Sequence, residues 1–309
     1  MDKFFVNGGC STDSQYFTGV GKCDVAEGVL DYLLITRSGA KYAIPADGDF
    51  TETIKKSLLL PYSDANKMWI VGKITTNNAP EGGDAIKNTK GTRGGSVTTG
   101  QNPISIAYAM PGGVCVYNQL SKFNGMECRV LRLDRNNHVF GVADETTIKG
   151  FSASLWCTQT PEADGGDVEM ITITVSFGVD YFKELSLRSN LKVSTLPDAL
   201  RPIYIEKGTA ANTAKLIYGC SREALDDATC QLLATAFKPS ETATEAVLAA
   251  FIDNNGNYPT AVAYANGVFT FTFATGAATA TSVKLNTPDV LALAGVSGIE
   301  GDDDLAVIA

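Results

Sequence analysis

Apolar and polar residues alternate over two long segments, 147–159 and 167–178, which flank the loop TPEADGG. A period of two places successive side chains on opposite faces of a strand, so one face of each segment is predicted to be buried. The two segments are therefore predicted to pair as an antiparallel hairpin. A shorter hairpin is predicted just before them, because ECRVLRLD (127–134) and HVFGVAD (138–144) flank the turn residues RNN.

Further elements are predicted on the N-terminal side of these hairpins. The segment DFTETIKKSLLL (49–60) favours a helix, since it opens with an aspartate that can accept from free amides of the first turn and ends before a proline. A second helix that covers a sheet is indicated by apolar residues at near three-residue spacing: Val114, Tyr117, Leu120 and Phe123. Branched and aromatic residues predict strands at 29–36, 67–75 and 104–110.

The segment 77–102 is rich in glycine and poor in apolar residues, which predicts a long loop without regular structure. Its GTRGG sequence resembles a phosphate-binding loop, but no Gly-Lys-Ser/Thr sequence follows to open a helix. A flexible interaction loop is therefore the preferred interpretation. Three basic residues of this loop are candidates for contact with a neighbouring subunit: Lys87, Lys90 and Arg93.

Composition shifts toward alanine and threonine from about residue 203. This shift predicts three parts of the chain: a glycine-rich leader (1–27), a main β domain (28–200) and a smaller β-rich domain (201–309). A short helix is predicted within 186–202, and SREALDDATCQLLATAF (221–237) favours a helix, with a strand at 230–237 as the alternative. Strands of the smaller domain are predicted in TAKLIYG (213–219), EAVLAAFID (245–253), NGVFTFTF (266–273) and ATSVKL (280–285).

The 309-residue chain carries 34 acidic and 25 basic residues, a formal net charge of -9. A net negative field disfavours general nucleic-acid binding, which gains most from released counterions around a basic protein. No apolar run reaches the roughly 18 to 20 residues that cross a bilayer, and the N-terminus lacks the apolar core of a signal peptide. We therefore expect a soluble protein without a membrane partner, made in a cytoplasm.

Residues suited to catalysis or metal binding do not cluster in the sequence. His138 is the sole histidine and follows the turn residues RNN, so a surface turn is favoured over a catalytic role. The seven cysteines include no pair at two-residue spacing, which disfavours a zinc ribbon and predicts buried, reduced thiols; whether Cys10 and Cys23 pair is left open. The sequence thus predicts no catalytic residue, no metal site and no cofactor, and a protein that is not an enzyme.

The segments LSKFNGMECRVLRLDRNNHVFG (120–141) and TIKGFSASLWCTQTPEADGGDVEMITITVSFG (147–178) resemble tail tube or tail ring proteins of tailed bacteriophages, particularly those of Bacteroidetes phages, including crAss-like phages. The pattern departs from that family at Cys128, where an aromatic is usual, and at RNN, which replaces an acidic-glycine turn. The likeness covers about residues 110–180. It is carried by Phe123, Asn124, Gly125, Asp134, Gly141, Lys149, Gly150 and Phe151.

The resemblance implies a mainly β fold of the β-sandwich or barrel type with a flanking helix, followed by an immunoglobulin-like domain. It also implies a virion protein that forms a homo-oligomeric ring, a hexamer or larger, beside other tail or connector proteins. An acidic ring would repel the phosphate backbone, so DNA is expected to pass through its channel without specific binding. The charged side chains of the first hairpin are expected to face solvent or a neighbouring subunit: Arg129, Arg132 and Arg135.

Two other function classes compete with this one. β-Rich chains with immunoglobulin-like parts also serve as surface-decorating modules that bind glycans. A hydrolase acting on cell-wall sugar is the third class, although no pair of carboxylates is singled out by the sequence.

Overall fold

The computed structural model describes residues 30–77, 84–88, 96–101, 104–144, 146–159, 169–178, 180–181, 184, 187–235, 250–253, 258–273, 282–293, 295–301 and 306–308. The predicted leader lies outside these residues. The chain forms two compact units, one of Met1–Ser57 and Ala65–Pro197 and the other of Leu58–Asp64 and Asp198–Ala309. Strands predominate over helices in the described residues, so the prediction of a mainly β fold is confirmed.

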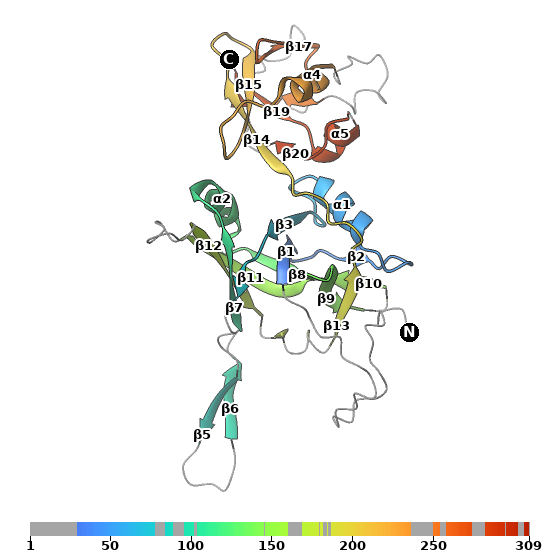
Figure 1. Ribbon diagram of the computed structural model, residues 1–309, viewed down its shortest axis with the longest axis vertical. Coiled ribbons are helices and arrows are strands. Elements are labelled where there is room, and N and C mark those ends of the chain that lie inside the picture. The colour runs from blue at the N-terminus through green and yellow to red at the C-terminus, as the bar shows by residue number, and fades with distance from the viewer. Residues whose placement is uncertain are drawn as a thin grey trace. The chain divides into compact units, whose positions relative to one another are not determined.

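An 11-stranded sheet forms the first unit (Figure 1). Its main path runs β2-β10-β9-β8-β11-β12-β7-β4, while β1 pairs with β8 and β3, and β13 pairs with β9. The strands are β1 (Leu30–Arg37), β2 (Tyr42–Ala43), β3 (Met68–Gly72), β4 (Thr76–Asn77), β7 (Ser105–Pro111), β8 (Glu127–Asp134), β9 (His138–Ala143), β10 (Thr147–Lys149), β11 (Phe151–Gln159), β12 (Met170–Phe177) and β13 (Arg188–Lys192).

Both predicted hairpins are present. In the longer one β11 and β12 pair antiparallel from Ala153↔Phe177 to Gln159↔Ile171, and β12 continues the sheet by pairing with β7. In the shorter one β8 and β9 pair through Arg132↔Phe140 and Leu133↔Val139. Because alternation is a local property of each strand, the sequence was sufficient to predict these pairs.

Helices α1 (Thr51–Leu59) and α2 (Val114–Leu120) confirm the two helices predicted in this unit. In α1 the buried side chains recur at helical spacing, as at Ile54 and Leu58. A single 3-10 turn, η2 (Ser121–Phe123), continues α2 and buries Phe123 in the core. The short helix predicted within 186–202 is wrong, because β13 occupies residues 188–192 and pairs antiparallel with β9.

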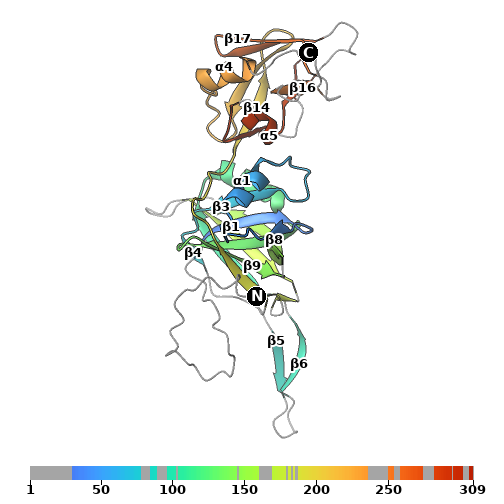
Figure 2. The same ribbon diagram turned by 90° about the vertical axis from the view of Figure 1, so that its right-hand side faces the viewer.

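The prediction that 77–102 lacks regular structure is also wrong. Within it, β5 (Asp84–Asn88) and β6 (Ser96–Gln101) pair antiparallel and form a two-stranded sheet of their own (Figures 1 and 2). Lys87 lies on β5 opposite Val97, whereas Lys90 and Arg93 lie outside the described residues. Each strand carries a single branched apolar residue, Ile86 in β5 and Val97 in β6. The alternation of apolar and polar residues that predicts a strand is therefore almost missing from this hairpin.

The second unit contains a five-stranded sheet, β17-β18-β15-β14-β20, and a three-stranded sheet, β16-β19-β21 (Figure 2). Its core is rich in phenylalanine, including Phe251, Phe269 and Phe271. The elements are β14 (Arg201–Lys207), β15 (Thr213–Tyr218), α4 (Asp227–Thr235), β16 (Phe251–Asp253), β17 (Ala261–Ala265), β18 (Val268–Thr272), β19 (Ser282–Leu285), α5 (Pro288–Leu293), β20 (Ile299–Gly301) and β21 (Ala306–Val307).

The strands predicted in 213–219, 266–273 and 280–285 are confirmed, and the one in 245–253 is described as β16 at its end. Helix α4 confirms the helix in 221–237 and rules out the alternative strand there. The pairing of β14 with β20 is parallel. Immunoglobulin domains are built from antiparallel strands, so this pair and the two helices depart from that pattern.

Candidate assembly site

The residues that carry the phage resemblance lie at structural positions, beginning with the corner between η2 and β8. The Phe123 ring packs edge-on against Trp69, with centroids 5.3 Å apart. The Asn124 side chain accepts a hydrogen bond from the Cys157 amide at 2.7 Å, and the Gly125 amide donates to the Leu155 carbonyl at 2.9 Å. These bonds fix the end of η2 to β11, and Gly125 adopts a positive φ of 73° that favours glycine there.

Asp134 shapes the turn between β8 and β9. Its buried carboxylate accepts hydrogen bonds from the amides of Asn136 and His138, both at 2.9 Å. Asn137 takes the left-handed conformation, with φ of 61°, which asparagine tolerates well in turns. His138 is the first residue of β9 and its Nδ1 lies 3.7 Å from the Asp134 carboxylate. The histidine therefore sits beside the turn, as the sequence predicts.

Two glycines of the motif allow close approach of neighbouring strands. A Cβ at Gly141 would lie 2.5 Å from Leu131 Cδ2 and 2.6 Å from the Lys149 carbonyl oxygen. A Cβ at Gly150 would lie 2.6 Å from the backbone nitrogen of Val130. Such distances are too short for a side chain, so glycine is required where β9, β10 and β11 meet β8. The motif is thus a set of residues that builds the sheet.

Arg132 does not face solvent, so that prediction is wrong. Only 5% of the residue is exposed, and its guanidinium stacks on the Phe151 ring at 4.6 Å from the centroid. Its Nη1 donates a hydrogen bond to the Tyr181 hydroxyl at 3.2 Å. The burial follows from the position of β8 within the sheet, where every side chain from Val130 to Asp134 is buried whichever face it points to.

Arg129 is half-buried and cross-links three segments. It donates to the carbonyls of Ser38 at 2.8 Å and Gly150 at 2.9 Å, and it pairs with the Glu184 carboxylate at 3.1 Å. The other Glu184 oxygen accepts from the Ser152 amide at 2.8 Å. Arg129 therefore holds the β10–β11 junction through contacts within the chain.

Arg135 is the most exposed of the three arginines on this hairpin. More than half of its side chain, 55%, is exposed, while its Nε lies 3.2 Å from the Asp31 carboxylate. Exposed pairs of this kind contribute little to stability and leave the guanidinium accessible. Arg135 and Lys87 stay predictions as interface residues.

The outer surface of β7, β12 and β11 carries no charge at nine aligned positions, which sequence reasoning missed. We name it the hydroxyl face. The alternate residues of the same three strands face the core and are buried, including Ile106, Val175 and Leu155. The Ser105 and Ser176 hydroxyls are hydrogen bonded at 2.9 Å. The face has three cross-strand rows: Ser105–Ser176–Ser154, Ala107–Thr174–Trp156 and Ala109–Thr172–Thr158.

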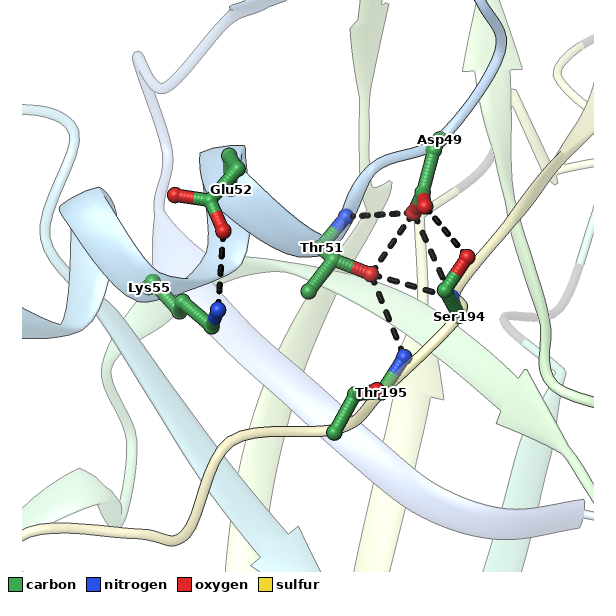
Figure 3. Close-up of polar contacts among 6 residues, drawn as sticks. All are labelled: Asp49, Thr51, Glu52, Lys55, Ser194 and Thr195. Carbon is green, nitrogen blue, oxygen red and sulfur yellow. Dashed lines mark hydrogen bonds and ion pairs between the residues drawn. The ribbon is translucent and has the colours of Figure 1, made fainter.

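A polar cluster joins the start of α1 to the segment after β13. Figure 3 shows the Asp49 carboxylate facing Thr51 and Ser194. It accepts hydrogen bonds from the Thr51 amide at 3.0 Å, the Thr51 hydroxyl at 2.6 Å, and the amide and hydroxyl of Ser194. The Ser194 hydroxyl, followed by that of Thr51, holds the pKa of Asp49 well below its ordinary value. These partners are amides and hydroxyls, so we interpret the cluster as a structural clamp.

Three described cysteines are free and buried: Cys128, Cys157 and Cys230. Burial raises the pKa of Cys128 to about 12 and that of Cys157 to about 11, which makes both thiols poor nucleophiles. The prediction of reduced thiols is confirmed for these three. It is wrong for Cys115 and Cys220, which are disulfide-bonded. Cys10 and Cys23 lie outside the described residues.

Within the described part of the chain, no three His, Cys, Asp or Glu side chains lie close enough together to hold a metal ion. Likewise, none of the described helices has the length and apolar character needed to span a bilayer. Comparison with models of protein families and with curated proteins gave no match to the sequence. Any function must therefore be argued from the chain itself.

Proposed function

We propose that the protein is a structural subunit that assembles with copies of itself into a ring or tube of a bacteriophage tail or head-tail connector. One observation carries the proposal: the residues that resemble the phage family have structural roles in this fold. Asn124 fixes η2 to β11, Asp134 shapes the turn, and Gly141 and Gly150 permit close strand contacts. These residues shape the sheet and supply no reactive group. A subunit of a ring or tube needs a defined fold and no catalytic chemistry, which supports the proposal.

The charge of the chain supports a channel through which DNA moves. Each copy carries a formal charge of -9, and closed symmetry repeats that charge around the ring. The summed negative field repels the phosphate backbone and prevents adhesion. In this proposal the partners are further copies of the chain and neighbouring tail or connector proteins in the virion, and DNA passes without specific contacts.

Electron microscopy of the purified full chain tests the proposal, together with its mass in solution from light scattering. Rings or tubes with a central hole are expected as the concentration rises. A particle that keeps the mass of one chain at every concentration would refute self-assembly.

A glycan-binding module is the alternative function, and the exposed Trp156 ring is the observation in its favour, since sugars stack on aromatic faces. A glycan array probed with the same preparation distinguishes the two. Sugar binding by a stable single chain supports the alternative.

A further inference from the structure

The hydroxyl face differs from the rest of this acidic chain because its nine positions carry only Ser, Thr, Ala and Trp. Charge begins at its border, where Glu127 of β8 lies opposite Ser154 of β11. An uncharged centre with a charged rim is the usual arrangement of a protein interface. Two copies that each carry a charge of -9 repel one another, and the repulsion is least where their uncharged surfaces meet.

Trp156 lies in the middle row of this face and is 54% exposed, although its chain neighbours Leu155 and Cys157 are buried. The indole sits over Gly125, where an added Cβ would be 3.5 Å from Cζ2 and Cη2. Its partner across the strand pair is Thr174 of β12. A tryptophan held on a strand loses little freedom on binding and buries a large apolar area, which makes it a typical centre of binding energy.

The edge strands of the sheet differ in length. The main path ends at β2 and β4, each of two residues, whereas β3 and β13, which lie off that path and each pair with a single strand, are edge strands of five residues. Ser, Thr and Ala side chains are short, so a second sheet can pack on this face with the two sheets about 10 Å apart. The face can therefore pack against a second sheet without any pairing at the strand edges.

A sugar fits this face less well than a protein does. Sites that bind sugars surround the aromatic ring with polar groups that fix the orientation of the ligand. The side-chain oxygen of Asn124, the residue before Gly125, already accepts from the Cys157 amide. The nine positions provide only hydroxyls and methyl groups beside the indole.

We propose that the hydroxyl face, with Trp156 at its centre, packs against a second copy of this chain in the assembled ring or tube. The proposal rests on the proposed function, because it names the surface through which self-assembly occurs. Burial of the indole on assembly should move its fluorescence to shorter wavelength. In the full chain with Trp69→Phe, all tryptophan emission comes from Trp156.

The test compares two variants of the face, Trp156→Lys and Thr158→Lys, with the control Leu232→Lys. The control places a lysine on α4, at an apolar residue that is 47% exposed and lies outside the hydroxyl face. Light scattering gives the concentration at which each full-length variant assembles, and circular dichroism confirms folding. We expect both face variants to raise that concentration at least about tenfold and the control to match the wild type. Thr158→Lys keeps the test valid if Trp156→Lys does not fold.

The outcomes separate the two proposals. A wild-type chain that never assembles refutes the proposed function itself. A wild-type chain that assembles, together with face variants that assemble equally well and an unshifted Trp156 spectrum, refutes only the role of the hydroxyl face. Glycan binding that is lost in Trp156→Lys, with assembly unchanged, assigns the face to a sugar and also overturns the inference.

Discussion

Asp49 provides a sharp test of how α1 is attached to the first unit. Replacement by asparagine removes the charge but keeps an oxygen that can accept from the Thr51 amide. Replacement by alanine removes every hydrogen bond that the Asp49 side chain accepts and leaves in the clamp only the bond from the Ser194 amide to the Thr51 hydroxyl, at 2.9 Å, and a longer one from the Thr195 amide. A free amide at the start of a helix costs about 1 kcal/mol, and a hydrogen bond to a charged group contributes about 1.5–3 kcal/mol before solvent screening. Because Asp49 is only half-buried, we expect destabilisation of about 2 kcal/mol for Asp49→Ala and about 1 kcal/mol for Asp49→Asn.

The effect should depend on pH in a defined direction. The pKa of Asp49 is lower in the folded protein than in the unfolded chain, where an aspartate titrates near about 3.9. Its charge therefore stabilises the fold fully above the unfolded pKa, and this stabilisation is lost as the pH falls toward the folded pKa. The difference between wild type and Asp49→Asn should be largest near pH 6 and smaller near about pH 3.

Urea unfolding followed by tryptophan fluorescence measures the difference in the free energy of unfolding of the first unit, to which Asp49 belongs. Both tryptophans, Trp69 and Trp156, belong to the first unit, so the signal does not report the second. Glu52→Gln is the matched control, since it removes a charge from the same helix. Glu52 forms an exposed pair with Lys55 at 2.8 Å (Figure 3), and its loss should cost less than about 0.5 kcal/mol. Equal stability of Asp49→Asn and wild type at pH 6, or a difference that is the same at pH 3, would refute the clamp.

Three further experiments, two substitutions and one chemical labelling, test the core of the first unit. Gly150→Ala should lower the free energy of unfolding by about 2 kcal/mol or more, because the new methyl group meets the β8 backbone; an unchanged urea midpoint contradicts this. Arg132→Ala should cost about 3 kcal/mol by removing a buried, hydrogen-bonded side chain, and a loss below 1 kcal/mol argues against its burial. Cys128 and Cys157 should resist a thiol reagent in the folded protein and react in urea, as peptide mass spectrometry can show; rapid native labelling contradicts their burial.

The sequence predicted the elements whose signal is local and strong. The β11–β12 hairpin alternates for most of its length, and α1 has both an acceptor at its start and buried residues at helical spacing. The β5–β6 hairpin was not predicted, because its strands are polar and lack the alternation of apolar and polar residues that indicates a strand. Strand β13 was not predicted for a related reason, since its sequence RSNLK contains one apolar residue.

The position of Arg132 shows where a strand pattern fails. Alternation predicts which residues share a face, and it correctly separates Arg132 from Leu131. It does not reveal that β8 is covered on both faces beyond Val130, because that depends on elements far away in the sequence. A polar residue on a covered face must then be buried with partners, here Tyr181 and Phe151.

The hydroxyl face illustrates the same limit from the other side. The serines and threonines of β11 and β12 are visible in the alternating segments, which predict only that one face of each strand is buried. That β7 joins them, through Ala107↔Thr174, depends on a pairing between residues that lie 67 positions apart in the sequence. Only the assembled sheet shows that the three uncharged strips are adjacent.

Self-assembly is the central claim, and electron microscopy of the purified full-length chain over a range of concentrations tests it most directly. The account predicts closed rings or tubes with a central channel, absent at high dilution and dominant as concentration rises. Single-chain particles at every concentration, with the first unit folded by circular dichroism and fluorescence, would contradict it.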